Sequence, residues 1–567
     1  MTQRGLNEPI NAPPRTELEV RLCEIWSEVL RRPVDDVKVA FTRLGGNSIG
    51  AARVAARIRA RLGLRVDLAT VLRNGSIEEL ASILAQVDQP KTDHPDAPLT
   101  PNPSRERLPM SHFQEWRFRA DDGLRVPLYN MALAYELSGP VRVDVLREVV
   151  TELASRHEPL RTNYDIVDGE ARQIIHPPSG VDFPVLDTRD SSSDPRADAL
   201  RLMEAEAMRI VDRRRDNLFQ PMLARYADDR YLLMLRIDRI AADGTSFGLI
   251  EQDVSDLYAS AISGSSPPDP APLQQADWAR WQRELLSGAY LDRLVAYWRR
   301  NLDGSQPLIE LTLPNGRSQP GQPRYQGRSQ HRRLGVELSG QMRARAKEAD
   351  VTLFIWALSA LHTFIWRLSG RDATTVVCPF ANRTRPEFER VVGSFAHGLI
   401  YRVEHSGDPK FSEMVVRVRD VCYSAWEHQA LPTGEVAKHV RPSSYLTLLD
   451  EFHVFFDLVR DVAHLKLSEV DVQQTFVNTG ASHPSLAVFL DDSTDDFALI
   501  VRAAADRIEA SALQWIVDEF TALLARTVHD PAECVSGLPP STESVAHCFQ
   551  GSDEEPAMAQ VPMRKVS

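Results

Sequence analysis

Apolar residues recur at three- and four-residue steps near the start of the chain. The first such run consists of Leu18, Leu22, Ile25, Trp26, Val29 and Leu30. A second run places Ile49, Val54, Ile58 and Leu62 on one face, and a third lies in "GSIEELASILAQV", where Ser76 is a suitable N-cap. This spacing predicts a small helical unit over residues 16–86, preceded by a polar, disordered leader over 1–15.

The pattern changes after this unit. Residues 87–106 are dense in Pro, Asp and Ser and predict an extended linker. Beyond it, apolar runs alternate with amphipathic segments. The predicted strands are 131–137, 231–237, 375–380, 398–404 and 497–504, and the predicted helices are 143–156, 193–212, 246–261, 338–348, 352–368 and 511–527. This alternation predicts an α/β body over 107–535 that is large enough for two lobes, followed by a disordered tail over 536–567.

Composition and charge exclude several classes of function. The net charge of -13 argues against nucleic acid as the main partner. No apolar run approaches the roughly 18 residues of a membrane span, and the N-terminus has no apolar signal region, so we expect a cytoplasmic protein without a membrane partner. The five scattered cysteines predict reduced thiols and no metal site. The basic stretch "RRRDN" (213–217) stands among acidic residues and is interpreted as a solvated helix face.

Ser48 is the first candidate for chemistry. It follows Gly45, Gly46 and Asn47 and opens the second helical segment. Glycines allow the backbone to turn, and a serine at a helix N-terminus can keep its hydroxyl exposed, where the helix dipole favours a phosphodiester. An isolated Gly-Gly-x-Ser is also consistent with a serine that only caps the helix.

The surroundings of Ser48 resemble the phosphopantetheine-bearing carrier domains of nonribosomal peptide synthetases. Their motif is Leu-Gly-Gly-His/Asp-Ser-Leu/Ile. The matching residues are Leu44, Gly45, Gly46, Ser48 and Ile49, while Asn47 replaces the usual His or Asp. The resemblance implies a small all-α four-helix carrier domain over 16–86. By the same resemblance, 4'-phosphopantetheine is attached to Ser48 and holds an aminoacyl or peptidyl thioester.

Four later motifs resemble those of the condensation domains of these synthetases. In chain order they are "LPMSHFQEW" (108–116), "RHEPLRTNY" (156–164), "ADWARWQRE" (276–284) and "FANRTRPEFERVVGSF" (380–395). The resemblance implies an α/β chloramphenicol-acetyltransferase-like two-lobed domain, with an N-lobe over 107–285 and a C-lobe over 286–535. In that family the lobes form a V, and the donor and acceptor arms enter its tunnel from opposite faces.

The family's central motif, His-His-x-x-x-Asp-Gly, is altered here. Asp238 and Arg239 replace the two histidines, whereas Asp243 and Gly244 are kept. A neutral imidazole at the second position can accept a proton, but the guanidinium of Arg239 stays protonated and offers donors only. By the resemblance, Asp243 pairs with an arginine that shapes the site. Arg383 in "ANRTRP" is the best candidate for this structural partner.

Other motifs are altered as well. In "VGSFAHG", His397 stands where Asn is usual, which makes it a candidate base from the C-lobe. "EHQALPTGEV" (427–436) loses the usual Asp after Gln429, and "VRPSSYLTLL" (440–449) does not reproduce the last motif. The candidate catalytic residues are therefore Asp238, Asp243 and His397.

Three functions fit this set of residues. A re-purposed condensation-like domain would act as a platform or gate for the substrate on the carrier. Glycopeptide-antibiotic synthetases contain such a domain, which has Arg at the second histidine position and recruits haem-thiolate oxygenases. A heterocyclization domain would use Asp238, Asp243 and Ser246, which fit the Asp-x4-Asp-x2-Ser motif of that class. Slow amide formation would rely on positioning of the thioester and the amine.

The resemblance also implies partners. A phosphopantetheinyl transferase would modify Ser48. No activating domain precedes the carrier in this sequence, so we expect an adenylation protein that acts in trans or a missing upstream region that supplies the activity. Other synthetase modules or a tailoring oxygenase complete the expected partners.

Overall fold

The structure is a computed structural model of the chain. It describes residues 12–86, 99–102, 104–121, 129–191, 193–303, 326–444, 454–459, 465–477, 479, 485–505 and 507–539. Much of the predicted leader, linker and tail, and the second half of the segment 440–449, therefore lies outside the described residues. Of the leader, residues 12–15 are described, and Ala12 is buried.

Four helices form the unit at the N-terminal end. They are α1 (Glu17–Leu30), α2 (Ser48–Leu62), α3 (Leu68–Arg73) and α4 (Ile77–Gln86). Thr16 and Glu19 cap the start of α1 with a reciprocal capping box, which satisfies backbone donors there. The short helix α3 is capped by Asp67, whose side chain accepts a hydrogen bond from the Thr70 amide. Apolar periodicity did not reveal α3, because six residues are too few to show it.

The N-lobe is built on a five-stranded sheet of order β12-β2-β7-β6-β5. Its strands are β2 (Asn130–Ser138), β5 (Val185–Asp187), β6 (Phe219–Ala227), β7 (Arg230–Asp238) and β12 (Asp471–Thr475). Helices α6 (Val143–Arg156) and α8 (Gly244–Ser263) pack against one face of this sheet. Helix α7 (Pro195–Ala207) packs against the other. Strand β7 is central and ends at Asp238, so the altered motif lies where a buried strand leaves the sheet.

The C-lobe has a six-stranded sheet of order β10-β9-β11-β13-β14-β8. Its strands are β8 (Gly327–Arg333), β9 (Ala373–Phe380), β10 (His397–Glu404), β11 (Val454–Val459), β13 (Leu486–Asp491) and β14 (Ala498–Ala504). The helices that cover it are α11 (Val336–Glu348), α12 (Leu353–Ser369), α13 (Phe411–Glu427) and α16 (Ala510–His529). The predicted two-lobed α/β fold is confirmed.

Shorter elements join the lobes. Strands β1 (Leu108–Pro109), β4 (Glu170–Ile175) and β3 (Thr162–Val167) form a small sheet, in that order. The helices near the junction are α5 (His112–Ala120), α9 (Gln275–Leu285), α10 (Gly288–Asn301) and α14 (Thr433–Val440). Strand β12 follows the C-lobe strand β11 in sequence but pairs with β2, so the chain crosses from one lobe into the sheet of the other.

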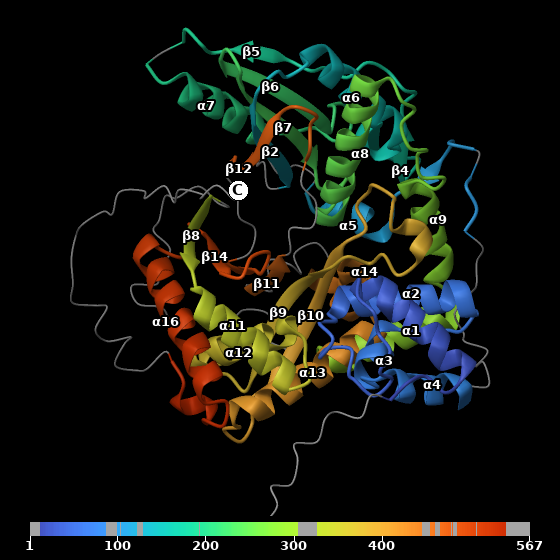
Figure 1. Cartoon of the computed structure of the whole chain (residues 1–567), viewed down its shortest axis with the longest axis vertical. Coiled ribbons are helices and arrows are strands. Elements are labelled where there is room, and N and C mark those ends of the chain that lie inside the picture. The colour runs from blue at the N-terminus through green and yellow to red at the C-terminus, as the bar shows by residue number, and fades with distance from the viewer. Residues whose placement is uncertain are drawn as a thin grey trace, which may run out of the picture.

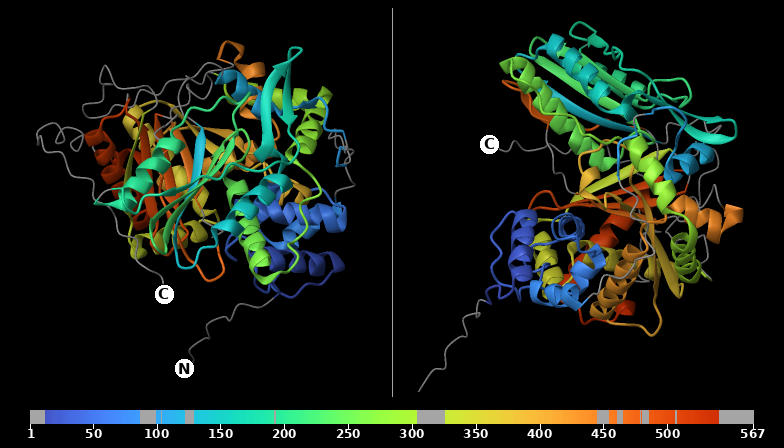
Figure 2. Two further views of the ribbon diagram at one scale, coloured as in Figure 1. Left: turned by 90° about the horizontal axis from the view of Figure 1, so that it is seen from above. Right: turned by 90° about the vertical axis from the view of Figure 1, so that its right-hand side faces the viewer.

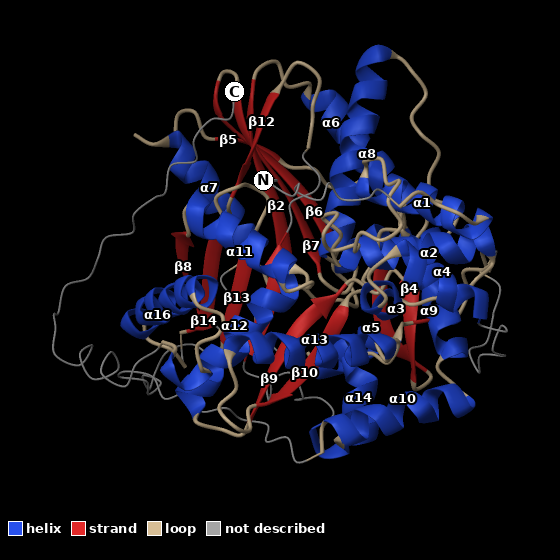
Figure 3. Cartoon of the chain, turned by 60° about the horizontal axis from the view of Figure 1, so that its bottom comes forward, coloured by secondary structure: helices blue, strands red, loops and turns tan. Residues whose placement is uncertain are grey.

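Figure 1 and the right-hand view of Figure 2 show the N-lobe above the C-lobe, and Figure 1 shows the small helical unit beside α13. Helix α3 packs on α13, and apolar residues of both belong to one continuous core. Figure 3 shows the helices of the C-lobe covering one side of its sheet. Part of the predicted linker is fixed to the larger body, because Arg105 forms ion pairs with Glu158 and Asp277 at 2.9 Å.

The predicted strands and most predicted helices are present, with ends shifted by a few residues. The helix expected over 193–212 is an exception, since α7 ends at Ala207. The interpretation of "RRRDN" as a solvated helix face was right for Arg214, Arg215 and Asn217, which are exposed, but wrong about the helix and about Arg213. These residues form a turn whose backbone accepts hydrogen bonds from the Tyr164 amide and the Asn163 side chain, and Arg213 points inward. Within the described ranges, no single helix is long and apolar enough to cross a membrane.

Candidate functional site

The loop before α2 leaves the Ser48 hydroxyl without a capping role. Asn47 is the N-cap, and its Oδ1 accepts a hydrogen bond from the Gly50 amide at 2.7 Å. Ser48 is partly exposed, and the next residue, Ile49, is 53% exposed. Among the described residues, the Ser48 hydroxyl has no hydrogen-bond partner. A serine that only caps the helix is therefore not what the structure contains.

Two glycines shape this loop. Gly45 has φ +91°, a backbone conformation that residues with a side chain rarely adopt. A Cβ on Gly46 would lie 2.2 Å from the ring of Phe41, which packs edge-on against Trp26 with 4.8 Å between ring centroids. The turn thus needs glycine at both positions, and it presents Ser48 at the positive end of a 15-residue helix. An accessible hydroxyl at a helix N-terminus fits a phosphodiester to 4'-phosphopantetheine.

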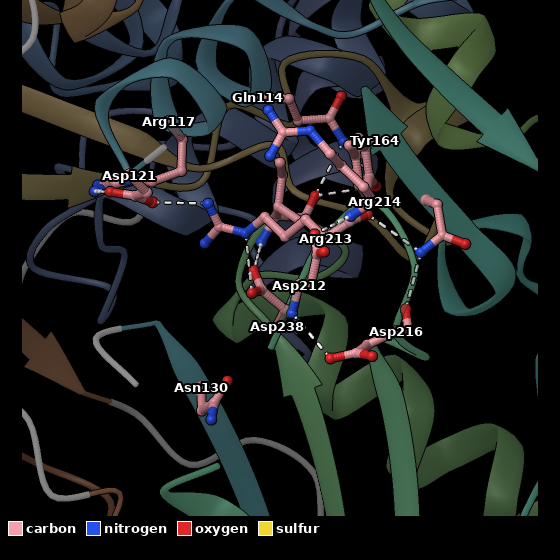
Figure 4. A network of polar contacts seen from close by, with 12 residues as sticks. Gln114, Arg117, Asp121, Asn130, Tyr164, Asp212, Arg213, Arg214, Asp216 and Asp238 are labelled. Carbon is pink, nitrogen blue, oxygen red and sulfur yellow. Dashed lines mark hydrogen bonds and ion pairs between the residues drawn. The ribbon is translucent and has the colours of Figure 1, made fainter. Parts of the chain in front are cut away.

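Asp238, at the end of β7, is held on both carboxylate oxygens (Figure 4). Its Oδ1 accepts a hydrogen bond from the Ile240 amide at 2.8 Å, and its Oδ2 accepts one from Arg213 Nε at 3.0 Å. Arg213 also donates to Asp121 at 2.8 Å, so one guanidinium bridges two carboxylates. The Arg213 and Asp238 side chains are only 10% and 5% exposed.

This network changes what Asp238 can do. Burial would lower the pKa of Arg213, but Asp238 and Asp121 outweigh it and raise that pKa. The Asp238 carboxylate is therefore paired with a permanent cation on one oxygen and with a backbone donor on the other. Sequence reasoning missed Arg213, whose only local signal was a run of arginines near a strand.

Asp243 is the N-cap of α8 and accepts five hydrogen bonds. Two come from the amide and hydroxyl of Ser246, both at 2.9 Å. The others come from Arg383 at 2.8 Å and from the amides of Phe395 and Ala396 at 3.0 and 3.1 Å. Burial would raise the pKa of Asp243, but Arg383 and the N–H donors hold it below its usual range.

The Asp243 network ties the two lobes together. Asp243 caps the N-lobe helix α8 and Ser246 lies in it, whereas Arg383 and Phe395 lie between the C-lobe strands β9 and β10. The Ser246 hydroxyl oxygen also accepts a hydrogen bond from the Gly393 amide at 3.0 Å and lies 2.8 Å from the Gly393 carbonyl oxygen. The structure thus brings Asp243 and Arg383 together as the sequence suggested, in a buried structural pair.

Arg239 lies at the second histidine position and extends toward the C-lobe. Its charged neighbours are Arg117 on α5, Asp243 and, from the C-lobe strand β11, Asp457. Burial lowers the pKa of Arg239, yet a guanidinium remains charged. Burial also raises the pKa of Asp457 to about 7, with Arg239 partly opposing the shift. Nothing in the local sequence around Asp457 marked it, because it meets Arg239 only through the fold.

His397 lies apart from these groups. It is 2% exposed at the start of β10, and its Nδ1 is 3.1 Å from the Gly398 carbonyl. Burial lowers the pKa of His397 to about 4. Tyr401, on the same side of β10, bonds Trp426 of α13, so this side of the strand faces the helices. In the described part of the chain, no contact joins His397 to Asp238 or Arg239, and no group of side chains could hold a metal ion.

Two sequence families match this chain. The phosphopantetheine attachment site family matches residues 20–84, and the condensation domain family matches residues 104–544. The malpinin synthetase of Mortierella alpina is 32% identical over 78% of this chain, and the dimodular nonribosomal peptide synthase of Bacillus subtilis is 28% identical over 93%. The chain spans only 6% and 22% of those two proteins.

Solved structures share the fold of the larger body. The X-domain from teicoplanin biosynthesis superposes with a TM-score of 0.70 at 22% identity, covering 78% of this chain and all of that one. The first condensation domain of the calcium-dependent antibiotic synthetase gives 0.65 at 17% identity, covering 76% of this chain and 99% of that one. The chain belongs to the condensation domain family of nonribosomal peptide synthetases, and it carries a phosphopantetheine attachment domain ahead of that domain.

Proposed function

We propose that the condensation-like domain of this chain is a platform or gate for the substrate that the carrier holds on Ser48. In this proposal the carrier works normally, whereas the condensation-like domain has lost proton transfer at its central motif. The observation that carries the proposal is the ion pair between Asp238 and Arg213, with 3.0 Å between Oδ2 and Nε. This ion pair engages the Asp238 carboxylate, which stands where the family has its first histidine.

Arg239 supports the same conclusion. General base catalysis needs a group that can lose and regain a proton near the operating pH. Arginine cannot do this, and Arg239 stands beside a second cation, Arg117. The position that holds the family's base is thus occupied by a permanent donor.

Heterocyclization is less well supported by these contacts. Its carboxylates would have to handle protons, yet Asp238 is bound to Arg213 and Asp243 is bound to Arg383. Ser246, the third residue of that motif, is committed to Asp243 and Gly393. All three side chains are used to hold the fold.

Amide formation is the second candidate, and one observation favours it. Asp457 is a carboxyl from the C-lobe that lies near Arg239, with a pKa of about 7. A group with that pKa can accept a proton from an amine at neutral pH. Asp457 would then compensate for the missing histidine.

Partners and location form part of the proposal. We infer modification by a phosphopantetheinyl transferase, loading by an adenylation protein in trans, and action in the cytoplasm. One of the similar structures is a complex of the X-domain with OxyB from teicoplanin biosynthesis. A tailoring oxygenase recruited in trans is therefore a candidate partner, along with neighbouring synthetase modules.

A reconstituted condensation assay tests the proposal. The chain is loaded at Ser48 with an acyl group, mixed with an acceptor aminoacyl carrier, and followed by intact-protein mass spectrometry. We expect no amide product above the uncatalysed rate, and no change in Asp238→Asn. A wild-type rate well above background that falls more than about tenfold, or roughly 1.4 kcal/mol, in Asp238→Asn would overturn the proposal.

Two further variants complete the assay. A loss of activity in Asp457→Asn but not in Asp238→Asn would support the second candidate. Asp471→Asn is the matched control, because Asp471 is an exposed carboxylate on β12. Thermal melting of each variant separates loss of activity from loss of fold.

A further inference from the structure

The chain between β9 and β10 contacts the carrier and both lobes; its residues 381–396 are called the junction segment. At its outer end, Glu389 Oε1 lies 3.4 Å from Nη1 of Arg57 on the carrier helix α2. The same helix packs on the short 3-10 helix η2 (Pro386–Phe388), which precedes Glu389. Val392, a few residues further on, is buried in the hydrophobic core of the N-lobe. One short segment therefore touches three parts of the molecule.

The inner end of the junction segment holds the start of α8. The Phe395 amide and Arg383 Nη1 donate to Oδ2 of Asp243 at 3.0 and 2.8 Å. Arg383 Nη2 lies 3.0 Å from the Ser246 hydroxyl oxygen, which also accepts a hydrogen bond from the Gly393 amide at 3.0 Å. These contacts cross from the C-lobe to the N-lobe, so they fix the two lobes to each other at this point.

Arg383 links the two ends of the junction segment. Its Nη2 also donates to the carbonyl of Val391 at 3.1 Å. Val391 is two positions after Glu389, and its own amide donates to the Phe388 carbonyl at 3.2 Å. The Glu389 amide donates to the Pro386 carbonyl at 3.0 Å. The residue that meets the carrier is thus connected, through one turn of hydrogen-bonded backbone, to the guanidinium that holds α8.

Aromatic packing holds the junction segment from the side of α9. The ring centroid of Phe388 lies 5.8 Å from those of Trp281 and Phe395, and the centroid of Phe395 lies 4.7 Å from that of Trp278. The guanidinium of Arg383 stacks on the Phe395 ring with 4.3 Å to the centroid. Phe388 and Phe395 are almost fully buried. Because a close-packed interior transmits a displacement instead of absorbing it, a shift at the carrier-facing end should reach Arg383.

Two other ion pairs between the carrier and the C-lobe lie outside the junction segment. Arg43 pairs with Asp350, between α11 and α12, at 3.2 Å, and Arg73 pairs with Glu427, at the end of α13, at 2.8 Å. The side chains of Glu427 and Glu389 are similarly exposed, at 32% and 30%. Removing either carboxylate should weaken docking of the carrier, but only Glu389 belongs to the segment that holds α8. Glu427 is therefore a matched control for Glu389.

We propose that the junction segment couples docking of the carrier to the contact between the lobes. A docked carrier strengthens the contacts of Asp243 with Arg383, and a released carrier weakens them. Coupling between two sites is reciprocal, so an intact Asp243 network strengthens docking by the same factor. Asp243 belongs to the central motif, so the position of the carrier is conveyed to that motif. The proposal goes beyond the platform function, because both equilibria exist in a chain that holds no tethered substrate.

A double-mutant cycle tests the coupling from the side of the N-lobe. Ser246→Ala weakens the inner contacts while leaving the buried pair of Asp243 with Arg383 in place. The docking equilibrium of the full chain, without an arm on its carrier, is measured by single-molecule energy transfer. The fluorophores are attached at two exposed positions, Glu24 on α1 and Glu337 on α11.

We expect Ser246→Ala to lower the docking constant about threefold in the wild type and in Glu427→Gln. In Glu389→Gln the same change should lower it less than about 1.5-fold, because the polar link to the carrier is already broken. An equal effect of Ser246→Ala in all three backgrounds, including no effect in any of them, would overturn the proposal.

Hydrogen exchange measures the reciprocal effect in a chain whose N-lobe is unchanged. The amides of Phe395 and Ala396 donate to Asp243, so their protection reports this contact. Reversing the C-lobe acid of all three carrier pairs to arginine should lower that protection about threefold, and exchanging the charges on both sides should restore it. Amides of β13 are the control for global unfolding. Unchanged protection at both amides in a chain whose carrier is released would contradict the coupling. Neither experiment measures turnover, so failure of the coupling and failure of the platform function are told apart.

Discussion

Nε of Arg213 lies 3.0 Å from Oδ2 of Asp238, so the residue at the first motif position takes part in a buried ion pair. A histidine there can exchange protons with a substrate. A carboxylate bound by a guanidinium and a backbone amide has its charge satisfied within the protein. The same substitution that removes the imidazole thus builds a link between the end of β7 and the turn after α7.

Removing the cation of this link should destabilise the domain. Arg213→Met would leave the buried carboxylates of Asp238 and Asp121 without their partner, and breaking a buried pair in this way costs about 3–5 kcal/mol. We expect a loss of that size in denaturant-induced unfolding. Arg214→Met is the matched control, since the Arg214–Asp165 pair is 36% exposed on both sides and should contribute less than about 1 kcal/mol. Equal losses in the two variants would contradict the buried role of Arg213.

Asp457 should make stability depend on pH near neutrality. Burial raises its pKa to about 7, so the folded state keeps a proton that the unfolded chain releases above about pH 4. Stability is therefore lost as the pH rises from about 4 to 7, by up to about 4 kcal/mol. Asp457→Asn cannot ionise, so its advantage over wild type in denaturant titrations should grow from pH 5 to pH 8. A pH-independent difference would show that Asp457 does not titrate in this range.

His397 should make stability depend on pH in the opposite direction, with the loss at acid pH. Burial lowers its pKa to about 4, so the folded state favours the neutral ring. The stabilisation of the folded state that comes from the neutral His397 ring is fully present above about pH 6.5. It is lost as the pH falls toward 4, by up to about 3 kcal/mol. His397→Asn should flatten the acid limb of the stability curve, whereas His176→Asn, at an exposed position, should leave it unchanged. Differential scanning calorimetry between pH 4 and 7 measures both.

The sequence was informative wherever a signal is local. Apolar periodicity located β7 and α8, because core faces repeat at fixed steps along one element. The glycine turn before α2 was equally visible, since Gly45 is required by its backbone conformation and Gly46 by the ring of Phe41, only five residues earlier. The pairing of Asp243 with Arg383 followed from the family motif rather than from any periodicity.

What the sequence did not reveal depends on contacts between distant residues. Arg213 was hidden in a basic run that composition alone assigns to solvent, and only folding places it against Asp238. Asp457 carries no motif and becomes notable only beside Arg239. Strand β12 was missed because its five residues, mostly exposed, have no apolar alternation, and its partner β2 lies more than three hundred positions earlier in the chain.

Loading of the carrier should depend on Ser48. Asn47 provides the helix cap, so Ser48→Ala removes the hydroxyl without removing a cap and should leave the melting temperature nearly unchanged. Transfer of a fluorescent phosphopantetheine analogue by a carrier transferase should be abolished. Ser76→Ala is the control, because Ser76 exchanges hydrogen bonds with Glu79 at the start of α4 and should lower stability without blocking the label. Persistent labelling of Ser48→Ala would place the attachment site elsewhere.

The carrier should dock on the C-lobe through ion pairs in which the carrier always supplies the arginine and the C-lobe always supplies the acid. Arginines of the carrier meet acids of the C-lobe in three pairs: Arg43–Asp350 at 3.2 Å, Arg57–Glu389 at 3.4 Å and Arg73–Glu427 at 2.8 Å. Each pair is partly exposed and contributes little alone, and salt screens all of them. Reversing all three acids to arginine should therefore release the carrier, as 1 M salt should for the wild type.

Small-angle scattering and distances between labels on the two domains measure this release. Exchanging the charges at all three pairs, so that the carrier bears the acids and the C-lobe the arginines, should restore docking, because the attraction depends on opposite charge rather than on which side bears it. Glu337→Arg, at an exposed position on α11, should leave docking unchanged. If the triple reversal keeps the carrier in place, the apolar contact of α3 with α13 holds it instead.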